Sequence, residues 1–475
     1  MDDPAELESF LEHNTYEDIK PFSPDTNTFQ DLDLPSIPLP PRGIILRFTR
    51  LAVFSVYRRI FLSVILLNIW QGHRIITLPR RSKYSPLLVD ISTAFSLNLL
   101  VAVLIRQDYI LNLLFFLCQH VPHITPLRIR RSLAKTYEYG GLHSGAAFCS
   151  VVWFSLLSWI LVWEYKAYRI ADPLILITST IILVILYTIL ITALPTLRQA
   201  HHNLFEHTHR LGGWTVLALS WLELYLFTRA LRHQAGPSSP GAQLSRLPAT
   251  YLLLLSTLHI ILPWLRLRRL PIVPSRLGVG VHAIRLHHNE PVPSCRVYKL
   301  AQSPLGEWHS FACIPSPNHS GGSLLISSAG DWTRRTINNP LSTYYTRGLP
   351  TVGVLCLTHL FRSIIVVTTG SGIGPCLGTL TSLPRTRFRI LWSAPEPRRT
   401  FGDEICDAVN ELDERAVVVD TRVSGRRDLV RLAYSMYKTE RAEAVFVVSN
   451  RRVTREVVYE LECRGVPAFG PVWDS

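Results

Sequence analysis

Six long apolar stretches between residues 43 and 270 constrain the fold of this chain more than any other feature. Each is close to the roughly 20 apolar residues that an α-helix needs to cross the hydrocarbon layer of a bilayer. The stretches are Leu51–Leu78, Pro86–Ile105, Ser144–Trp163, Pro173–Leu194, Leu211–Leu231 and Ala249–Leu265. Charged residues make up only 18% of the chain, against about 25% in ordinary soluble domains. We therefore predict a multi-pass α-helical membrane domain over residues 43–270, with a shorter apolar piece, Tyr109–Cys118, at the membrane surface.

Arginine and lysine are unevenly distributed around these stretches. They gather before the first stretch, between the second and third, between the fourth and fifth, and after the sixth, although Arg80, Arg81 and Lys83 lie on the opposite side. Because cytosolic loops carry an excess of basic residues, this pattern predicts a cytosolic N-terminus and a cytosolic C-terminal part. Bases placed beside apolar stretches indicate the lipid bilayer as the partner and argue against nucleic acid. The plasma membrane and an endomembrane both fit this topology.

The first 42 residues have a different character. The first 40 contain ten acidic residues against one base, Lys20, together with several prolines and no apolar periodicity. Such a composition cannot bury enough apolar surface to fold, so we predict a disordered cytosolic segment over residues 1–42. Its start is acidic rather than basic, and we therefore expect no signal peptide.

Beyond residue 277 the chain changes to short strands. Four alternating segments separated by turn residues predict an antiparallel β-barrel over residues 277–350. They are Val279–His287, Ser294–Ala301, Trp308–Ile314 and Ser323–Ser328. From 351 to 475, buried strands alternate with helices, which predicts an α/β domain with a parallel sheet and a ligand at the carboxyl ends of its strands.

A glycine-rich turn follows the first strand of that α/β domain. Ile364–Val367 is a run of four β-branched residues, and Gly370-Ser371-Gly372-Ile373-Gly374-Pro375 comes directly after it. Glycines allow close approach of the backbone to a ligand, and Pro375 suits the first turn of a helix. A strand, a glycine turn and a helix N-terminus together form a cradle for pyrophosphate, so we predict that this turn binds a dinucleotide.

Three motifs in the last 170 residues resemble the ferric reductase and NADPH oxidase superfamily. Trp308–Ala312 is similar to its flavin motif, Gly330–Thr333 to its Gly-Asp-Trp-Thr, and Gly370–Pro375 to its nicotinamide-nucleotide loop. The chain resembles most closely a fungal branch, the TmpA-like integral membrane flavoproteins, whose reductase portion also occurs in nonribosomal-peptide-synthetase-like proteins. This closer resemblance rests on Gly140–Gly145, Phe205–Arg210, Gly213-Trp214 and Phe469–Ser475.

The resemblance implies an FAD site and an NAD(P)H site. For FAD it implies His309, Ser310, Phe311, Ala312, Gly330, Asp331, Trp332, Thr333 and Trp473. For the nicotinamide nucleotide it implies Gly370, Ser371, Gly372, Ile373, Gly374, Pro375, Arg398, Arg399, Ser449 and Asn450. Ala312 lacks the hydroxyl of the family motif, and Ser449 stands where relatives have a cysteine. Glu396 favours a free ribose hydroxyl and the two arginines a 2′-phosphate, so we expect NADPH and leave NADH as an alternative.

Heme is the third cofactor to consider, because superfamily members that move electrons across the bilayer carry two. Two spans of such proteins each supply a pair of histidines. Here, thirteen residues beyond His143 and His209 stand Leu156 and Leu222, so the outer ligands are missing. His143 and His209 themselves fall on the same predicted cytosolic side and could hold a single heme. The alternative, which we favour, is two interfacial histidines without heme.

These inferences predict a membrane flavoenzyme that passes electrons from NAD(P)H through FAD to a small-molecule acceptor. Without a second heme, no relay crosses the outer half of a hydrocarbon layer about 30 Å thick, so we expect delivery at the cytosolic face. One alternative is a heme-containing transmembrane ferric or oxygen reductase. Another is a membrane scaffold or sensor with weak catalysis. Glu223, ionisable within the fifth stretch, is a further functional candidate, unless it simply pairs with a polar neighbour.

Overall fold

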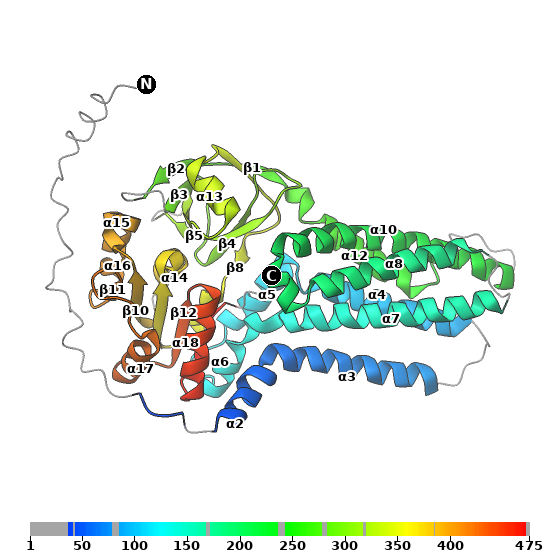
Figure 1. Cartoon of the computed structure of the whole chain (residues 1–475), viewed down its shortest axis with the longest axis horizontal. Coiled ribbons are helices and arrows are strands. Elements are labelled where there is room, and N and C mark those ends of the chain that lie inside the picture. Colours follow the sequence, from blue (N-terminus) through cyan, green and yellow to red (C-terminus); the bar gives the residue numbers. More distant parts are fainter. Residues whose placement is uncertain are drawn as a thin grey trace.

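The computed structural model describes residues 37–40, 43–77, 85–167, 172–235, 243–277, 283–316, 320–383 and 385–471. Figure 1 shows a bundle of long helices at one end of the molecule and two β-sheets at the other. Most of the predicted disordered segment, residues 1–36 and 41–42, lies outside the described residues, as does Trp473.

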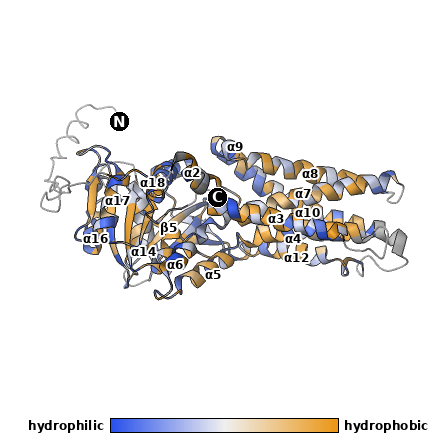
Figure 2. Cartoon of the chain, turned by 90° about the horizontal axis from the view of Figure 1, so that it is seen from below, coloured by the Kyte–Doolittle hydropathy of each residue, from blue (hydrophilic) through white to orange (hydrophobic). Residues whose placement is uncertain are grey.

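The bundle contains the six predicted apolar stretches as helices. They are α3 (Val56–Thr77), α4 (Ser85–Leu104), α7 (Gly140–Lys166), α8 (Leu174–Thr192), α10 (His202–Ala235) and α12 (Pro248–Ile261). Within the described residues, six helices are long and apolar enough to cross a membrane, and Figure 2 shows hydrophobic residues along the bundle. The bundle core holds Ile91, Phe154 and Ile182, while Ile177 and Leu254 are exposed on its outside. The helix prediction is confirmed, and insertion into a bilayer remains a prediction.

The segment between α4 and α7 leaves the bundle and packs against both sheets. It contains α5 (Asp108–Gln119), α6 (Leu127–Leu133) and a 3-10 turn, Thr136–Tyr139. Asp108 receives a hydrogen bond from Lys299 at 2.6 Å, and Asn112 bonds the backbone of Pro350 and Val352. Helix α5 therefore docks on the antiparallel sheet through polar side chains, and the place of its apolar part at a membrane surface remains a prediction.

The first sheet is antiparallel and has six strands in the order β2-β3-β6-β5-β4-β8. They are β2 (Val273–Arg276), β3 (Ala283–His288), β4 (Arg296–Leu300), β5 (His309–Pro315), β6 (Gly322–Ser327) and β8 (Thr351–Val352). A separate ribbon pairs β1 (Arg268–Pro271) with β7 (Thr343–Thr346), and α13 (Asp331–Asn338) follows β6. The antiparallel part of the prediction is confirmed, but the strand pairing does not form a closed barrel. Edge strand β2 contains Pro274, which has no N–H to donate to another strand.

The second sheet is fully parallel, with the order β11-β10-β9-β12-β13. Its strands are β9 (Ser363–Thr369), β10 (Arg387–Ala394), β11 (Val417–Asp420), β12 (Ala444–Val448) and β13 (Ala468–Phe469). Its helices are α14 (Ile373–Leu380), α15 (Pro397–Phe401), α16 (Asp403–Leu412), α17 (Leu429–Thr439) and α18 (Arg451–Cys463). The predicted βα alternation is confirmed. Gly402, with a φ of 80°, interrupts the helical backbone between α15 and α16.

Candidate functional site

The glycine-rich turn lies at the carboxyl end of the central strand β9. Strands β10 and β12 flank β9 on opposite sides, so the loops after β9 and β12 diverge from a topological switch point. Ligands of open parallel sheets bind at such a point. The hydroxyls of Thr369, at the end of β9, and Ser449, directly after β12, form a hydrogen bond. The sequence-predicted Ser449 is therefore brought beside the glycine-rich turn.

Two glycines of this turn have structural reasons to be glycine. Gly370 has a φ of 52°, which disfavours a side chain. A Cβ on Gly372 would lie 2.5 Å from the carbonyl oxygen of Val448, at the end of strand β12. The turn is thus pressed onto the strand ends, and the first free N–H groups of α14 follow it. Ile373 and Pro375 lie in the first turn of α14, where the sequence predicted Pro375.

The remaining predicted nucleotide residues already have protein partners. Asn450 caps α18 by accepting a hydrogen bond from the N–H of Val453 at 3.1 Å. Arg398 forms ion pairs with Asp403 at 2.5 Å and Asp407 at 3.1 Å. Arg399 pairs with Glu396 at 3.2 Å. Because these acids neutralise the two arginines, their geometry does not favour a 2′-phosphate, and the choice between NADPH and NADH stays a prediction.

Aromatic rings organise the flavin-like motif on β5. The ring centroids of His309 and Trp332 are 4.5 Å apart, and those of Phe311 and Trp332 are 5.6 Å apart. Strand alternation places Ser310 on the opposite, exposed face. Ala312 pairs with Val297 of the neighbouring strand β4. Trp332 is 5% exposed, so here its ring packs the two motif side chains together.

The imidazole of His309 has an unusual polar environment. Its Nε2 has no hydrogen-bond partner in the part of the chain that the structure describes, and the Glu307 carboxylate lies 3.5 Å away. Burial lowers the pKa of His309, and Glu307 opposes this shift. A neutral ring at neutral pH follows, with one nitrogen available to a bound molecule.

The Gly-Asp-Trp-Thr motif forms the start of helix α13. The Thr333 hydroxyl accepts hydrogen bonds from the N–H groups of Ala329 and Gly330, each at 2.9 Å, and thereby caps this helix. Asp331 is exposed and pairs with Arg334. Thr333 and Trp332 consequently have local structural roles, and the N-terminus of α13 is the part of the motif that can receive an anion.

The glycine-rich turn contacts the antiparallel sheet that carries the flavin-like motif. The hydroxyls of Ser327, at the end of β6, and Ser371, in the turn, lie 2.6 Å apart. Helix α14 packs on β5 and β6, where a Cβ on Gly374 would lie 3.1 Å from the Leu325 side chain. The two sheets therefore present their predicted ligand-binding residues on either side of one junction.

The two candidate heme ligands meet inside the bundle. The rings of His143 on α7 and His209 on α10 have centroids 6.0 Å apart, and His143 Nδ1 lies 2.8 Å from the carbonyl oxygen of Ala102. That hydrogen bond fixes the tautomer and leaves Nε2 of His143 free of it, as expected for a metal-ligating histidine. The contact brings the two candidate ligands together, and heme binding remains a prediction. No group of three or more metal-ligating side chains occurs within the described ranges.

Sequence reasoning missed an aromatic cluster between the flavin-like motif and the bundle. The Arg347 guanidinium lies 4.4 Å from the ring centroid of Trp264 and 4.3 Å from that of Trp308, and the Trp264 ring also contacts Trp214 of α10. Burial lowers the pKa of Arg347 to about 10. Arg210 of α10 donates to the Gly306 carbonyl oxygen at 2.7 Å. The bundle thus contacts the loop before β5. The spacing of these residues in the sequence does not predict this contact.

Comparisons with known proteins identify relatives of this chain. A family model described as "Adenylate-forming reductase 03009, C-terminal domain" matches residues 354–475. Two proteins of Coprinopsis cinerea, Adenylate-forming reductase 03009 and Adenylate-forming reductase 06235, are 37% and 38% identical over 94% and 92% of this chain. The alignment covers 42% of each relative, so the chain spans less than half the length of the curated relatives it matches. Similarity to proteins named reductases is therefore a finding, and similarity to ferric reductases remains a prediction.

Two solved structures each resemble less than half of this chain. A ferredoxin NADP+ reductase from Neisseria gonorrhoeae with bound FAD and NADP is 13% identical and covers 44% of this chain and 99% of its own, with a TM-score of 0.35. Phthalate dioxygenase reductase is 14% identical and covers 42% and 64%, with a TM-score of 0.33.

Proposed function

We propose that this chain is a membrane-bound, flavin-dependent oxidoreductase that passes electrons from NAD(P)H through FAD to a small-molecule acceptor. One observation carries the proposal: the Ser327–Ser371 hydrogen bond holds the glycine-rich turn against the sheet that bears the flavin-like motif. A hydride donor and its acceptor must lie in contact, and this junction brings the two predicted nucleotide sites together. The word "reductase" in the names of both relatives agrees with this reaction class.

Residues of this chain would bind and orient the two nucleotides. The backbone of Gly370–Gly372 and the N-terminus of α14 suit the pyrophosphate of NAD(P)H, and the N-terminus of α13 suits that of FAD. His309 and Phe311 would contact the flavin, with the neutral imidazole offering one hydrogen bond. FAD, when bound, accepts hydride from the nicotinamide and passes electrons on. For the electron acceptor we propose three chemical classes: a lipophilic metabolite, a quinone or dioxygen.

The same geometry suggests where the acceptor meets the flavin site. Helix α10 begins beside the flavin-like motif, since Glu206 and His202 act electrostatically on His309. The basic loops that predict the cytosolic side lie at this end of the bundle. We therefore place electron delivery at the cytosolic face, with the N-terminus and both sheets in the cytosol.

Purified full-length protein in detergent tests this function. It should take up FAD and oxidise NADPH in the presence of an artificial acceptor such as ferricyanide. Gly372→Ala, which places a Cβ 2.5 Å from the Val448 carbonyl oxygen, should raise the KM for NADPH at least about tenfold while leaving the flavin absorbance intact. Gly353→Ala is the matched control, because its Cβ would meet nothing closer than 3.6 Å. Protein that binds no FAD, or that binds it without turnover, would contradict the proposal.

A heme-containing reductase is the second candidate, and the His143–His209 contact favours it. Heme would add an electron-accepting centre inside the bundle, held by these two imidazoles. An absorbance spectrum of the same preparation separates the candidates. A heme band lost in both His143→Ala and His209→Ala would establish the second candidate, and a flavin spectrum alone would support the first.

A further inference from the structure

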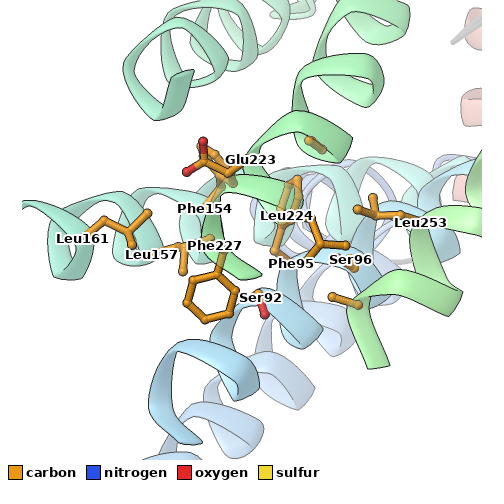
Figure 3. Close-up of a pocket in the computed structure, with 12 residues that line it drawn as sticks. Ser92, Phe95, Ser96, Phe154, Leu157, Leu161, Glu223, Leu224, Phe227 and Leu253 are labelled. Atoms are coloured by element: carbon orange, nitrogen blue, oxygen red, sulfur yellow. The ribbon is translucent and has the colours of Figure 1, made fainter. Parts of the chain in front are cut away.

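Reactive side chains are buried in both halves of the molecule, but their surroundings differ. In the bundle, Glu223 lines a small apolar cavity between α4, α7, α10 and α12, shown in Figure 3. Its carboxyl group accepts a hydrogen bond from the Ser179 hydroxyl of α8, so Glu223 pairs with a polar neighbour, the simpler of the two alternatives for this residue. The junction of the two sheets instead buries two thiols in contact with each other, Cys295 and Cys356.

Cys295 and Cys356 are 61 residues apart in the sequence and meet where the antiparallel sheet joins the parallel-sheet domain. Cys295 directly precedes β4, and Cys356 belongs to η4 (Val354–Leu360), a 3-10 segment ahead of β9. They are 8% and 2% exposed. The Cys356 Sγ lies 3.7 Å from the carbonyl oxygen of Cys295 and is also within hydrogen-bonding reach of the Cys295 sulfur. Because the two sulfurs are already neighbours, joining them in a bond of about 2.05 Å requires only a local shift.

The backbone holds Cys295 in an unusual conformation. Its φ of 62° lies in the left-handed region, which glycine and asparagine adopt far more readily than cysteine. Its N–H donates to the carbonyl oxygen of Gly378 in α14 at 3.2 Å, and its carbonyl oxygen accepts from the N–H of Gly353 at 3.2 Å. Such conformations persist where the surroundings impose them, and they cluster at functional positions. Helix α14 and the segment before η4 thus fix Cys295 against Cys356.

The two sulfurs differ in protonation. Hydrogen bonds to its sulfur, first from Cys356 and then from His359, outweigh burial and lower the pKa of Cys295 to about 5. Burial raises the pKa of Cys356 above that of an ordinary thiol. At neutral pH the pair therefore holds one proton, on Cys356, and Cys295 is a thiolate. A thiolate is the nucleophilic form of cysteine, and a neighbouring thiol can react with its oxidised form.

Three other buried cysteines near the sheets lack this environment. Burial raises the pKa of Cys313, Cys376 and Cys406 to about 12 in each case. The Cys376 thiol donates to the carbonyl oxygen of Gly372 at 3.2 Å. All three stay protonated at neutral pH and are poor nucleophiles. Contact with a second thiol and stabilisation of the thiolate therefore coincide at Cys295.

We propose that Cys295 and Cys356 form a peroxide-reactive thiol pair at this junction. The Cys295 thiolate attacks one oxygen of hydrogen peroxide, the O–O bond breaks, and the other oxygen leaves as hydroxide and is protonated to water. Cys295 is then a sulfenic acid. The Cys356 sulfur attacks the Cys295 sulfur, and its proton leaves with the displaced hydroxyl group as a second water molecule. Two thiols are oxidised to one disulfide, and one peroxide is reduced to two water molecules.

Burial selects the class of oxidant. A residue that is 8% exposed admits a small peroxide more readily than a peptide disulfide, which must bring its own sulfur into line with the attacking thiolate. The reaction uses neither NAD(P)H nor FAD, so its test does not depend on the proposed function. The disulfide would link the antiparallel sheet to the segment that leads into β9. It would constrain the unfolded chain, and the oxidised protein should therefore melt at a higher temperature.

Peptide mapping of the full-length protein in detergent tests the pair. After brief treatment with hydrogen peroxide and alkylation of the remaining thiols, mass spectrometry should find the Cys295–Cys356 crosslink, formed at least about tenfold faster than any other disulfide of the chain. Glutathione disulfide at the same concentration should form this crosslink at least about tenfold more slowly than peroxide does. The melting temperature should rise on oxidation and return after reduction with dithiothreitol.

Two substitutions assign the roles of the two sulfurs. Cys356→Ser should leave Cys295 as a sulfenic acid, which dimedone traps. Cys295→Ser should give neither a crosslink nor a sulfenic acid on Cys356. Cys406→Ser is the matched control, because Cys406 is as buried as Cys356 and burial raises its pKa as well. The control should form the Cys295–Cys356 crosslink at an unchanged rate.

Four results would overturn the proposal. Unmutated protein that keeps both thiols after peroxide treatment would show that the pair is inert. A sulfenic acid on Cys356 as abundant as that on Cys295 would remove the assigned nucleophile. Crosslinks to other cysteines at the same rate would remove the pairing, and equal rates with glutathione disulfide would remove the oxidant class. If a variant fails to fold, the peptide map of the unmutated protein decides alone.

Discussion

Two helices in different halves of the molecule carry glycines four residues apart, and they use them differently. In α7, a Cβ on Gly141 would lie 2.2 Å from the Tyr57 carbonyl oxygen, and one on Gly145 would lie 3.0 Å from the Val64 side chain. Helix α3 therefore packs on this face of α7, as small residues allow between membrane helices. In α14, a Cβ on Gly378 would lie 2.2 Å from the Cys313 carbonyl oxygen of β5.

The comparison shows that one spacing serves two kinds of contact. The α7 pair brings together two helices that are neighbours in an apolar bundle. The pair Gly374 and Gly378 joins α14 of the parallel sheet to the antiparallel sheet, so it holds two sheets together. Gly374 also belongs to the predicted nucleotide loop. The glycine-rich turn is consequently a predicted binding motif in its first half and a packing motif in its second.

The largest effect should come from filling the layer contact. Gly378→Val would force side-chain atoms into the backbone of β5, which cannot move aside, and should destabilise the protein by about 3 kcal/mol or more. Thermal unfolding and limited proteolysis of the full-length protein would measure this loss. A Gly378→Val protein that unfolds like the unmutated one would show that the two sheets are held together elsewhere.

An intermediate effect should come from the helix contact. Gly141→Ala should destabilise the bundle by about 1–3 kcal/mol, because the new methyl group meets the α3 backbone. Gly213→Ala, in α10, is the matched control, since its Cβ would meet nothing within 4 Å. In a helix interior that change should be neutral or stabilising by about 0.5–1 kcal/mol. Equal melting temperatures for the two variants would remove the packing role of Gly141.

The smallest effect should come from an ionic contact that resembles neither glycine pair. The Arg130 guanidinium of α6 is 4% exposed and bonds Glu443, beside the parallel sheet, at 2.8 and 3.2 Å. Burial alone would raise the pKa of Glu443, but hydrogen bonds from Arg130 and the Arg362 N–H outweigh burial and lower it. A lowered folded-state pKa means that this stabilisation is complete above the ordinary glutamate pKa of 4.5 and is lost as the pH falls through the folded value.

Melting temperature as a function of pH measures that contact. Near neutral pH the ionisation of Glu443 should not change the melting temperature of the unmutated protein. In acid the melting temperature should fall by a few degrees. Glu443→Gln should show a lower melting temperature near neutral pH and a shallower fall in acid. A variant curve parallel to that of the unmutated protein would assign the acid sensitivity to other carboxyl groups.

Local pattern predicted the elements of the fold, and distant contacts decided the rest. Apolar length located all six bundle helices, and the run Ile364–Val367 with its glycine turn located β9 and α14. Strands β1 and β13 escaped prediction, because Arg268–Pro271 and Ala468–Phe469 are too short to show a period and exist only through their partners.

Sequence reasoning likewise found some residues of the candidate site and missed others. The motifs led to His309 and Gly372, because each belongs to a contiguous run of unusual residues. The family resemblance led to Ser449, which stands where relatives have a cysteine. Arg347 was missed because its partners Trp264 and Trp308 come from other segments of the chain. No local sequence pattern predicts a cation that lies between two such rings. Pairing of Arg398 with acids was equally invisible, although Asp403 and Asp407 follow it closely.

The docking segment between α4 and α7 has a practical consequence. Phe115, Cys118 and Ala134 of this segment are buried in the same apolar cluster as Phe361 and other residues of the parallel-sheet domain. Truncating the chain near residue 264 to obtain a soluble catalytic fragment would therefore cut that cluster open. A fragment that keeps residues 108–135, fused ahead of residue 264 through a flexible linker, should be the more tractable one to express and crystallise.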